Sequence, residues 1–303
     1  MRRDRTVALA QTTVTAVLWG TSFPVISVAI SSGLDPRTFV FLRFAIAAPV
    51  MLAVAGLYGK GTRRLLRSRA VWVIGLFNAT GFVCQFLGQA LTTASVAALL
   101  VNLSVVLAAL GSMLFLREKM TTVRASGVAF AFAGTALLTT NGDLSGLTGG
   151  QLLGDALYLL AAVAWAGYIV YAKKKTDEKD WDPLAVSACI VAVTAFLVFP
   201  VALTAGLSFA LSTASWEAVL YTAVFNTAIP FALYQAGLRY LTATSSAIVL
   251  MLEIVTAVAI STLFLGEVLG VASWTGAVLV LVSVLLVSGF EISGKSLSVY
   301  QRR

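Results

Sequence analysis

Long uninterrupted runs of apolar residues, separated by short polar stretches, dominate this sequence. Each run is about as long as the roughly 20 mostly apolar residues that a helix needs to cross the hydrocarbon core of a bilayer. The runs are continuous rather than alternating, which excludes the strands of a transmembrane barrel. We therefore predict an all-α polytopic membrane protein with ten transmembrane helices. The predicted spans are 7–30, 37–57, 70–91, 94–116, 124–140, 152–172, 184–206, 216–238, 243–265 and 272–290.

The composition agrees with this pattern. Hydrophobic residues make up 59% of the chain and charged residues only 11%, whereas a soluble domain carries about 25% charged residues. The first run follows Arg2-Arg3-Asp4-Arg5, but it is longer than the apolar region of a signal peptide and no A-x-A-like cleavage site ends it. We interpret it as the first membrane helix.

The net charge of +8 is distributed along the chain as in membrane proteins. With ten crossings, 19 of the 21 basic residues fall on one side, in the termini and in every second loop. The exceptions are Arg37, at the other face, and Arg43, inside the second span. Loops rich in Lys and Arg stay in the cytoplasm. We therefore predict cytoplasmic termini, a location in the plasma membrane (the inner membrane of a bacterium), and no nucleic-acid partner.

The two halves of the chain resemble each other. Leu-Arg-Glu-Lys-Met at 116–120 recurs as Leu-Gly-Glu-Val-Leu at 265–269, 149 positions later, and Asp35-Pro36 recurs as Asp182-Pro183 after 147 positions. Each half holds five spans, an odd number, so the second half enters the bilayer from the opposite side and the repeats are inverted. We predict a first repeat over 1–142, a second over 151–291, and a cytoplasmic tail over 292–303.

Polar residues at the span ends predict how the helices begin and end. Aspartate is a good N-cap and proline suits the first helical position, so Asp35-Pro36 and Asp182-Pro183 predict the starts of spans 2 and 7. Glu118 and Glu267 end spans 4 and 9. A carboxylate there can stabilise the electropositive start of the next helix.

Glycines stand out in the last span of each half. Gly127 and Gly134 lie in span 5 and Gly276 in span 10. Small residues let helices approach closely in lipid. We predict that these two spans support the other helices or form the contact of a homodimer, rather than a substrate wall.

Glu253 is the only acidic residue deep in a predicted span. A charge at the bilayer centre costs about 2.5–3.5 kcal/mol on insertion scales, so such residues mark functional sites. Glu253 can carry a coupled proton, can face a substrate amine, or can be a neutral acid bonded between helices. Arg43 lies about one and a half turns into span 2 and either anchors the helix by snorkelling or binds a substrate carboxylate.

Amides and aromatic rings supply the remaining candidates for a substrate site. In span 3, Asn78, Phe82 and Gln85 share one helical face and can bind a polar substrate or a neighbouring helix. The repeat offset places Gln85 opposite Tyr234, and places Gly81 opposite Pro230, whose missing N–H can bend span 8. The other candidates near the mid-plane are Trp19, Asn102, Trp165, Tyr168 and Asn226.

Strict repeat symmetry pairs Asn102 with Met251 and Glu253 with Ser104. Asn102 and Ser104, which are two positions apart, lie on roughly opposite sides of their helix. We therefore expect Glu253 rather than Asn102 to face a cavity. The aromatic rings either line that cavity, where they can hold apolar groups or cations, or pack between helices.

Several classes of chemistry are disfavoured by what the chain lacks. It has no histidine, and its two cysteines, Cys84 and Cys189, are far apart in the sequence. A zinc site needs clustered Cys and His ligands, so we expect no metal and no cofactor. With a single deep carboxylate, we also expect that the protein is not an enzyme.

Three segments carry a resemblance to a known family. Trp19-Gly20-Thr21-Ser22-Phe23 is similar to the opening motif of the drug/metabolite transporter superfamily, and more narrowly of the EamA domain, which occurs twice in such proteins. Asp35-Pro36 with Arg43-Phe44 resembles the start of its helix two, and Leu252-Glu253 with Leu265-Gly266-Glu267 resembles its ninth helix. The family often has proline after the glutamate. Here Ile254 and, in the first half, Val105 stand instead, which removes a usual cause of kinks.

The resemblance implies ten helices around a central cavity lined mainly by helices 1, 3, 4, 6, 8 and 9. It implies a secondary transporter that works by alternating access, most simply an exporter of amino acids or similar small amphipathic metabolites, with a possible coupling to protons. An antiporter of phosphorylated sugars or nucleotide-sugars, or a multidrug exporter, are the alternatives. Phosphorylated substrates call for several deep Lys or Arg residues, and only Arg43 is available.

Overall fold

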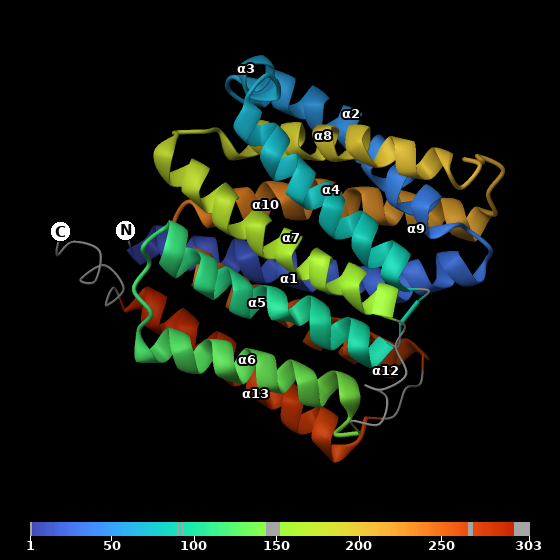
Figure 1. Cartoon of the computed structure of the whole chain (residues 1–303). Coiled ribbons are helices and arrows are strands. Elements are labelled where there is room, and N and C mark those ends of the chain that lie inside the picture. The colour runs from blue at the N-terminus through green and yellow to red at the C-terminus, as the bar shows by residue number, and fades with distance from the viewer. Residues whose placement is uncertain (1, 90, 93, 144–151, 266–268, 294–303) are drawn as a thin grey trace.

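The computed structural model describes residues 2–89, 91–92, 94–143, 152–265 and 269–293, which form helices joined by short connections (Figure 1). Glu267, much of the joint between the predicted repeats and tail residues 294–303 lie outside this set. In chain order the helices are α1 (Arg2–Ser31), α2 (Pro36–Tyr58), α3 (Thr62–Leu66), α4 (Arg69–Gln89), α5 (Ala94–Phe115), α6 (Thr122–Thr140), α7 (Leu152–Glu178), α8 (Pro183–Leu203), α9 (Thr213–Ala223), the π-helical η2 (Val224–Ala228), α10 (Ile229–Leu238), α11 (Ala243–Leu250), α12 (Leu252–Leu265) and α13 (Val271–Ile292).

The helices follow the predicted spans closely. Within the described residues, eight helical segments are long and apolar enough to cross a membrane, and a shorter apolar helix covers Leu99–Phe115. Predicted span 216–238 falls on three consecutive segments, α9, η2 and α10. The chain is an all-helical polytopic membrane protein over the residues described, and the count of ten crossings stays a prediction.

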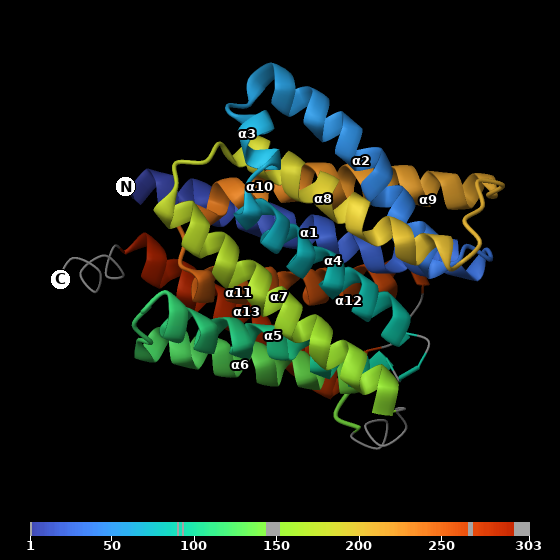
Figure 2. The same cartoon turned by 45° about the horizontal axis from the view of Figure 1, so that its top comes forward.

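The helix ends gather at two opposite faces of the bundle (Figures 1 and 2). α1 begins and α13 ends at one face, where Nη1 of Arg5 donates a hydrogen bond to the carbonyl of Glu291 at 3.1 Å. The connections α2–α4, α5–α6, α7–α8 and α10–α11 reach the same face and carry most of the basic residues. We call this end of the bundle the basic face.

Asp35 and Asp182 begin their helices as predicted. Oδ1 of Asp35 accepts a hydrogen bond from the backbone N–H of Arg37, and Oδ1 of Asp182 accepts one from Ala185, both at 2.8 Å. Proline follows each aspartate at the start of its helix. The guanidinium of Arg37 also bonds the Asp35 carboxylate at 2.9 Å and holds its pKa below the usual range.

Helices from the two halves of the chain pack against each other in pairs. α6 packs along α13, α2 along α8, α4 and α5 along α7, and α1 along α10 and α12. Gly134 and Gly276 meet where α6 contacts α13, because a Cβ on Gly134 would lie 2.8 Å from the carbonyl oxygen of Gly276. The small residues of spans 5 and 10 therefore serve a contact within the chain, and a homodimer stays an untested prediction.

Glu118 joins α5 to the start of α11 at the basic face. Its carboxylate accepts hydrogen bonds from the backbone N–H of Ala243 at 2.7 Å and from Oγ1 of Thr244 at 3.0 Å. Glu118 therefore stabilises a helix start as expected, but that helix is α11, whereas α6, the next helix in the chain, is capped by Thr121. The carboxylate instead caps a helix start about 125 residues away in the sequence, which a reading of neighbouring residues could not identify.

A buried ion pair ties further helices together at the same face. Glu291 near the end of α13 accepts hydrogen bonds from Nη2 of Arg124 at 2.9 Å and from Oγ of Ser245 at 2.6 Å. Both members of the ion pair are fully buried, at 1% and 0% side-chain exposure. Because Arg124 lies on α6 and Ser245 on α11, this cluster and Glu118 both hold α11 in place.

Candidate functional site

One large cavity of about 540 Å³ lies inside the bundle. Ligand pockets commonly enclose about 300–1,000 Å³, so it has room for a small molecule. α1, α4, α5, α7 and the pair α11–α12 form most of its wall, and α2 contributes Arg43. The resemblance also implied helix 8, but the described part of α9–η2–α10 contributes no lining residue and stands behind the wall.

The cavity extends from the middle of the bundle toward the face opposite the basic face. Its lining residues on α4 begin at Phe82, near the end of that helix, while those on α5 lie between Ala97 and Val105, in its first half. Thr92, in the connection between these two helices, also lines it. Because α4 ends and α5 begins away from the basic face, the cavity faces that opposite side.

Aromatic rings from three helices form the inner wall. Phe82 of α4 meets Trp165 of α7 edge-to-face, with ring centroids 4.9 Å apart. Trp165 contacts Tyr168 in the same way at 6.3 Å, and Trp19 of α1 also lines the cavity. Gly81 permits this packing, since a Cβ there would lie 2.8 Å from the Trp165 indole. The wall suits an apolar or aromatic group.

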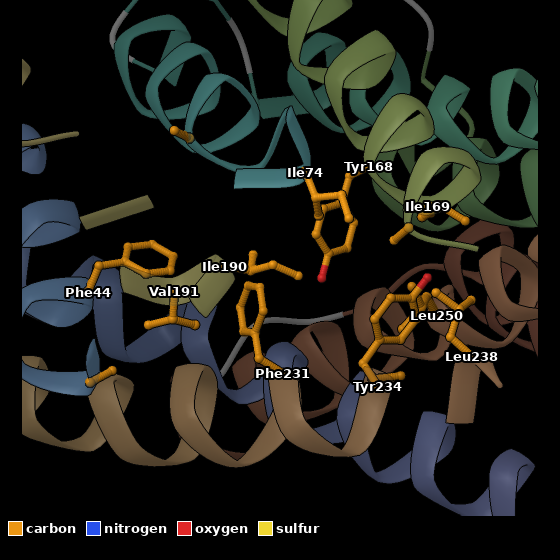
Figure 3. Close-up of a cluster of buried hydrophobic side chains, with 14 of the residues drawn as sticks. Phe44, Ile74, Tyr168, Ile169, Ile190, Val191, Phe231, Tyr234, Leu238 and Leu250 are labelled. Carbon is orange, nitrogen blue, oxygen red and sulfur yellow. The ribbon is translucent and has the colours of Figure 1, made fainter. Parts of the chain in front are cut away.

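Tightly packed rings close the path between the cavity and the basic face. Tyr168 stacks on Tyr234 with centroids 6.0 Å apart, and its hydroxyl accepts a hydrogen bond from Nε2 of Gln235 at 3.0 Å. Phe231 packs against Tyr168 edge-to-face. Figure 3 shows Phe231 and Tyr234 of α10 reaching toward Tyr168 of α7 in this layer. The layer separates the cavity from the basic face.

Arg43 is a buried cation, 2% exposed, that reaches the cavity from α2. Nη2 donates a hydrogen bond to the carbonyl of Asn226 at 2.9 Å, and Nε donates one to Oγ1 of Thr227 at 3.0 Å. Its guanidinium lies 5.4 Å and 5.1 Å from the ring centroids of Phe44 and Phe82. These partners are neutral, so the guanidinium of Arg43 is held in place without a direct ion pair among the described residues.

Glu253 lines the same cavity from the first turn of α12. The helix is interrupted at Met251, just before it, although no proline follows the glutamate, whereas α5 is continuous through Val105. Among the described residues, neither Glu253 nor Arg43 forms an ion pair. The cavity therefore presents one acidic and one basic side chain that do not neutralise each other by direct contact.

The predicted amides separate into two groups. Gln85 and Asn102 line the cavity, and Oε1 of Gln85 accepts a hydrogen bond from Nε1 of Trp165 at 3.4 Å. Asn78 instead donates to Thr194 of α8 at 2.9 Å, and Asn226 donates to Oγ1 of Thr21 at 2.9 Å. These two bonds join helices, which is the alternative role the sequence left open.

Asn102 faces the cavity together with Glu253, against the expectation from strict repeat symmetry. Among the described side chains of α5, five line it: Ala97, Val101, Asn102, Ser104 and Val105. At about 3.6 residues per turn, these positions span roughly half of the helix circumference. The cavity therefore contacts enough of the circumference of α5 to include both Asn102 and Ser104, which are two residues apart.

Of the ten predicted site residues, seven line the cavity: Trp19, Phe82, Gln85, Asn102, Trp165, Tyr168 and Glu253. Asn78, Asn226 and Tyr234 are not among its described lining residues. The sequence reading missed Tyr158, Thr92, Thr139 and Ser261. Tyr158 could have been predicted from the sequence, because it lies two helical turns before Trp165 and therefore shares its helical face. No local signal marks the others.

Comparison with known proteins places the chain among transporters. The sequence model of the EamA-like transporter family matches residues 7–140 and 152–289. The uncharacterized transporter YyaM of Bacillus subtilis (strain 168) is 28% identical, covering 84% of this chain and 85% of YyaM. A protein of Streptantibioticus cattleyicolor named "Probable terminal-alkyne amino-acid exporter" is also 28% identical, covering 90% and 91%. A solved crystal structure shares the fold, with a TM-score of 0.76 and 19% identity over 93% of this chain and 96% of that one.

Proposed function

The chain belongs to the EamA-like transporter family, and we propose that it exports amino acids or similar small amphipathic metabolites as a secondary transporter. The observation that carries this proposal is the cavity itself. It combines the guanidinium of Arg43, the carboxyl group of Glu253 and an aromatic wall in about 540 Å³. The related protein of S. cattleyicolor named as a probable amino-acid exporter adds support.

A zwitterion satisfies this arrangement better than a molecule with one charge. An isolated buried charge is costly unless an opposite charge or hydrogen bonds compensate it. A substrate carboxylate can meet Arg43 while its ammonium group meets Glu253, and an apolar side chain can lie against Phe82 and Trp165. A phosphorylated sugar carries more negative charge, and the described residues of the wall offer it a single arginine, so this alternative is disfavoured.

Alternating access through two inverted repeats, residues 1–142 and 151–291, is the transport mechanism we propose. The helix contacts support it, because exchanging the two predicted repeats maps the pair α4–α7 onto α1–α10 and the pair α5–α7 onto α1–α12. The packed layer of Tyr168, Phe231 and Tyr234 closes one side of the cavity. Opening that layer while closing the opposite side would move the substrate across.

The orientation that we propose assigns the two faces of the bundle to the two sides of the membrane. The basic face lies in the cytoplasm by the positive-inside rule, with both termini there and the chain in the plasma membrane. The cavity then faces the outside in this conformation, which is the state that releases an exported substrate. Glu253 is the candidate for coupling to protons, because its carboxyl group lines the cavity.

A substrate screen in proteoliposomes tests the proposal. Purified protein is reconstituted, and counterflow of radiolabelled amino acids is measured with and without an imposed pH gradient. We expect saturable counterflow of amino acids with apolar side chains. If no amino acid or related metabolite exchanges, the proposed substrate class is refuted. Flux at channel-like rates without counterflow would refute a carrier mechanism.

A further inference from the structure

Pro230, two residues beyond the π-helical turn η2, leaves a backbone carbonyl without its usual donor. In an α-helix the N–H of residue 230 would donate to the carbonyl of residue 226, but proline has no N–H. The turn before it is π-helical, with the N–H of Ile229 donating to the carbonyl of Val224. The carbonyl of Asn226 is therefore left without an α-helical partner, in the middle of the bundle.

Two side chains of the cavity wall use that carbonyl. Nη2 of Arg43 donates to it at 2.9 Å and Nε1 of Trp19 donates to it at 3.0 Å. The neighbouring Thr227 accepts from Nε of Arg43 at 3.0 Å. Two nitrogens of the guanidinium are thus fixed, and Nη1 makes no hydrogen bond with a described residue. Since Arg43 lines the cavity, this third nitrogen remains for a ligand.

The turn is itself fixed against α1. Nδ2 of Asn226 donates to the carbonyl of Leu18 and to Oγ1 of Thr21, and Oγ1 of Thr227 donates to the carbonyl of Thr222 at 3.0 Å. Asn226 and Thr227 are both fully buried. π-helical turns of this kind are rare and often occur at functional sites. Here the turn connects α1, α2 and α10 at the level of the cavity.

Building on the proposed function, we propose that Pro230 and the Asn226 carbonyl are positioning elements for substrate recognition. Because Pro230 has no N–H to donate to this carbonyl, the carbonyl is available to accept hydrogen bonds from Arg43 and Trp19. The guanidinium is then aimed with its free nitrogen toward the substrate's carboxylate. Neither Pro230 nor Asn226 lines the cavity, so both act through the side chains that bind this carbonyl. Of these two side chains, only Arg43 carries a charge that can bind the carboxylate.

Two substitutions test this role from different directions. Pro230→Ala supplies an N–H that competes with Arg43 for the Asn226 carbonyl. Thr227→Val keeps the shape of the side chain and removes the acceptor of the Arg43 Nε hydrogen bond. Pro49→Ala is the matched control, because Pro49 also lies inside a helix but is exposed on α2. The probes are phenylalanine and phenethylamine, which differ by the carboxylate.

Binding of both probes is measured on the purified proteins by competition, with counterflow as a second readout. We expect Pro230→Ala and Thr227→Val each to weaken phenylalanine binding about tenfold, or about 1.4 kcal/mol, and to leave phenethylamine binding unchanged. Pro49→Ala should match the wild type. In an Arg43→Gln background, Pro230→Ala should have no further effect on phenylalanine.

The outcomes separate this inference from the proposed function. If the wild type prefers phenylalanine but both variants keep that preference, the positioning role is overturned while the proposed function stands. Equal weakening of both probes, or a full effect of Pro230→Ala in the Arg43→Gln background, also overturns it, because the change would then not act through Arg43. If the wild type binds neither amino acids nor their analogues, the proposed function fails and this role fails with it.

Discussion

Gly20 sets the contact between α1 and α12 at the level of Glu253, and Gly20→Ala should disrupt it. A Cβ on Gly20 would lie 2.6 Å from Cβ of Thr256 and would also meet the backbone carbonyl of Glu253. Carbon atoms in contact prefer about 3.5–4.0 Å, so the helices must separate by roughly 1 Å. The backbone carbonyl cannot rotate away as a flexible side chain would.

Overpacking of this kind costs about 1–3 kcal/mol, which is roughly a 5- to 150-fold change in the equilibrium constant of unfolding. Gly56→Ala is the control, because no atom would lie within 4 Å of the new Cβ. Both substitutions gain the same helix propensity, about 1 kcal/mol, so the difference between them isolates the contact. Unfolding in detergent, followed by fluorescence, should find Gly20→Ala less stable than Gly56→Ala. Equal stability would refute the close packing of α1 on α12.

Three further predictions concern the charged side chains. Glu118→Gln removes the carboxylate that caps α11 and should loosen this helix at the basic face. In a Ser246→Cys background, the buried thiol should then react faster with a reagent added from that face. Unchanged labelling would contradict the role of Glu118 in holding α11 in place. Arg124→Gln removes the closer of the two arginines that pair with Glu291, and should cost about 3–5 kcal/mol in unfolding experiments. Substituting leucine at both Arg124 and Glu291 should recover much of that loss. A loss as large in the double variant would argue against the pair. Glu253→Gln keeps the shape of the side chain and should abolish the dependence of transport on an imposed pH gradient. If transport and its pH dependence are unchanged in this variant, Glu253 is not the coupling group.

The parts of the fold that depend on local chemistry were predictable from the sequence. Span lengths follow from bilayer thickness, and the caps at Asp35 and Asp182 follow from residues next to the helices they begin. Glu253 was identified because a deep acid is costly in lipid. These signals require no knowledge of which helices are neighbours.

The features that sequence reasoning missed depend on distant partners. The π-helical turn at Asn226 is stabilised by donors from Arg43 and Trp19, about 180 and 210 residues away in the chain. The cap that Glu118 supplies belongs to α11 rather than to the following helix. Asn102 reaches the cavity because α5 is lined over about half its circumference. Repeat symmetry predicts a common scaffold, but it does not determine which side chains each helix presents to the cavity.

Recognition of both ends of a zwitterion is the central claim, and one counterflow experiment tests it directly. Phenylalanine, phenethylamine and 3-phenylpropanoate compete for exchange in proteoliposomes that contain the wild type, Arg43→Gln or Glu253→Gln. The account predicts that the wild type prefers phenylalanine over both analogues, that Arg43→Gln loses the preference over the amine, and that Glu253→Gln loses the preference over the acid. A wild type that exchanges either analogue as well as phenylalanine, or variants that retain both preferences, would contradict it.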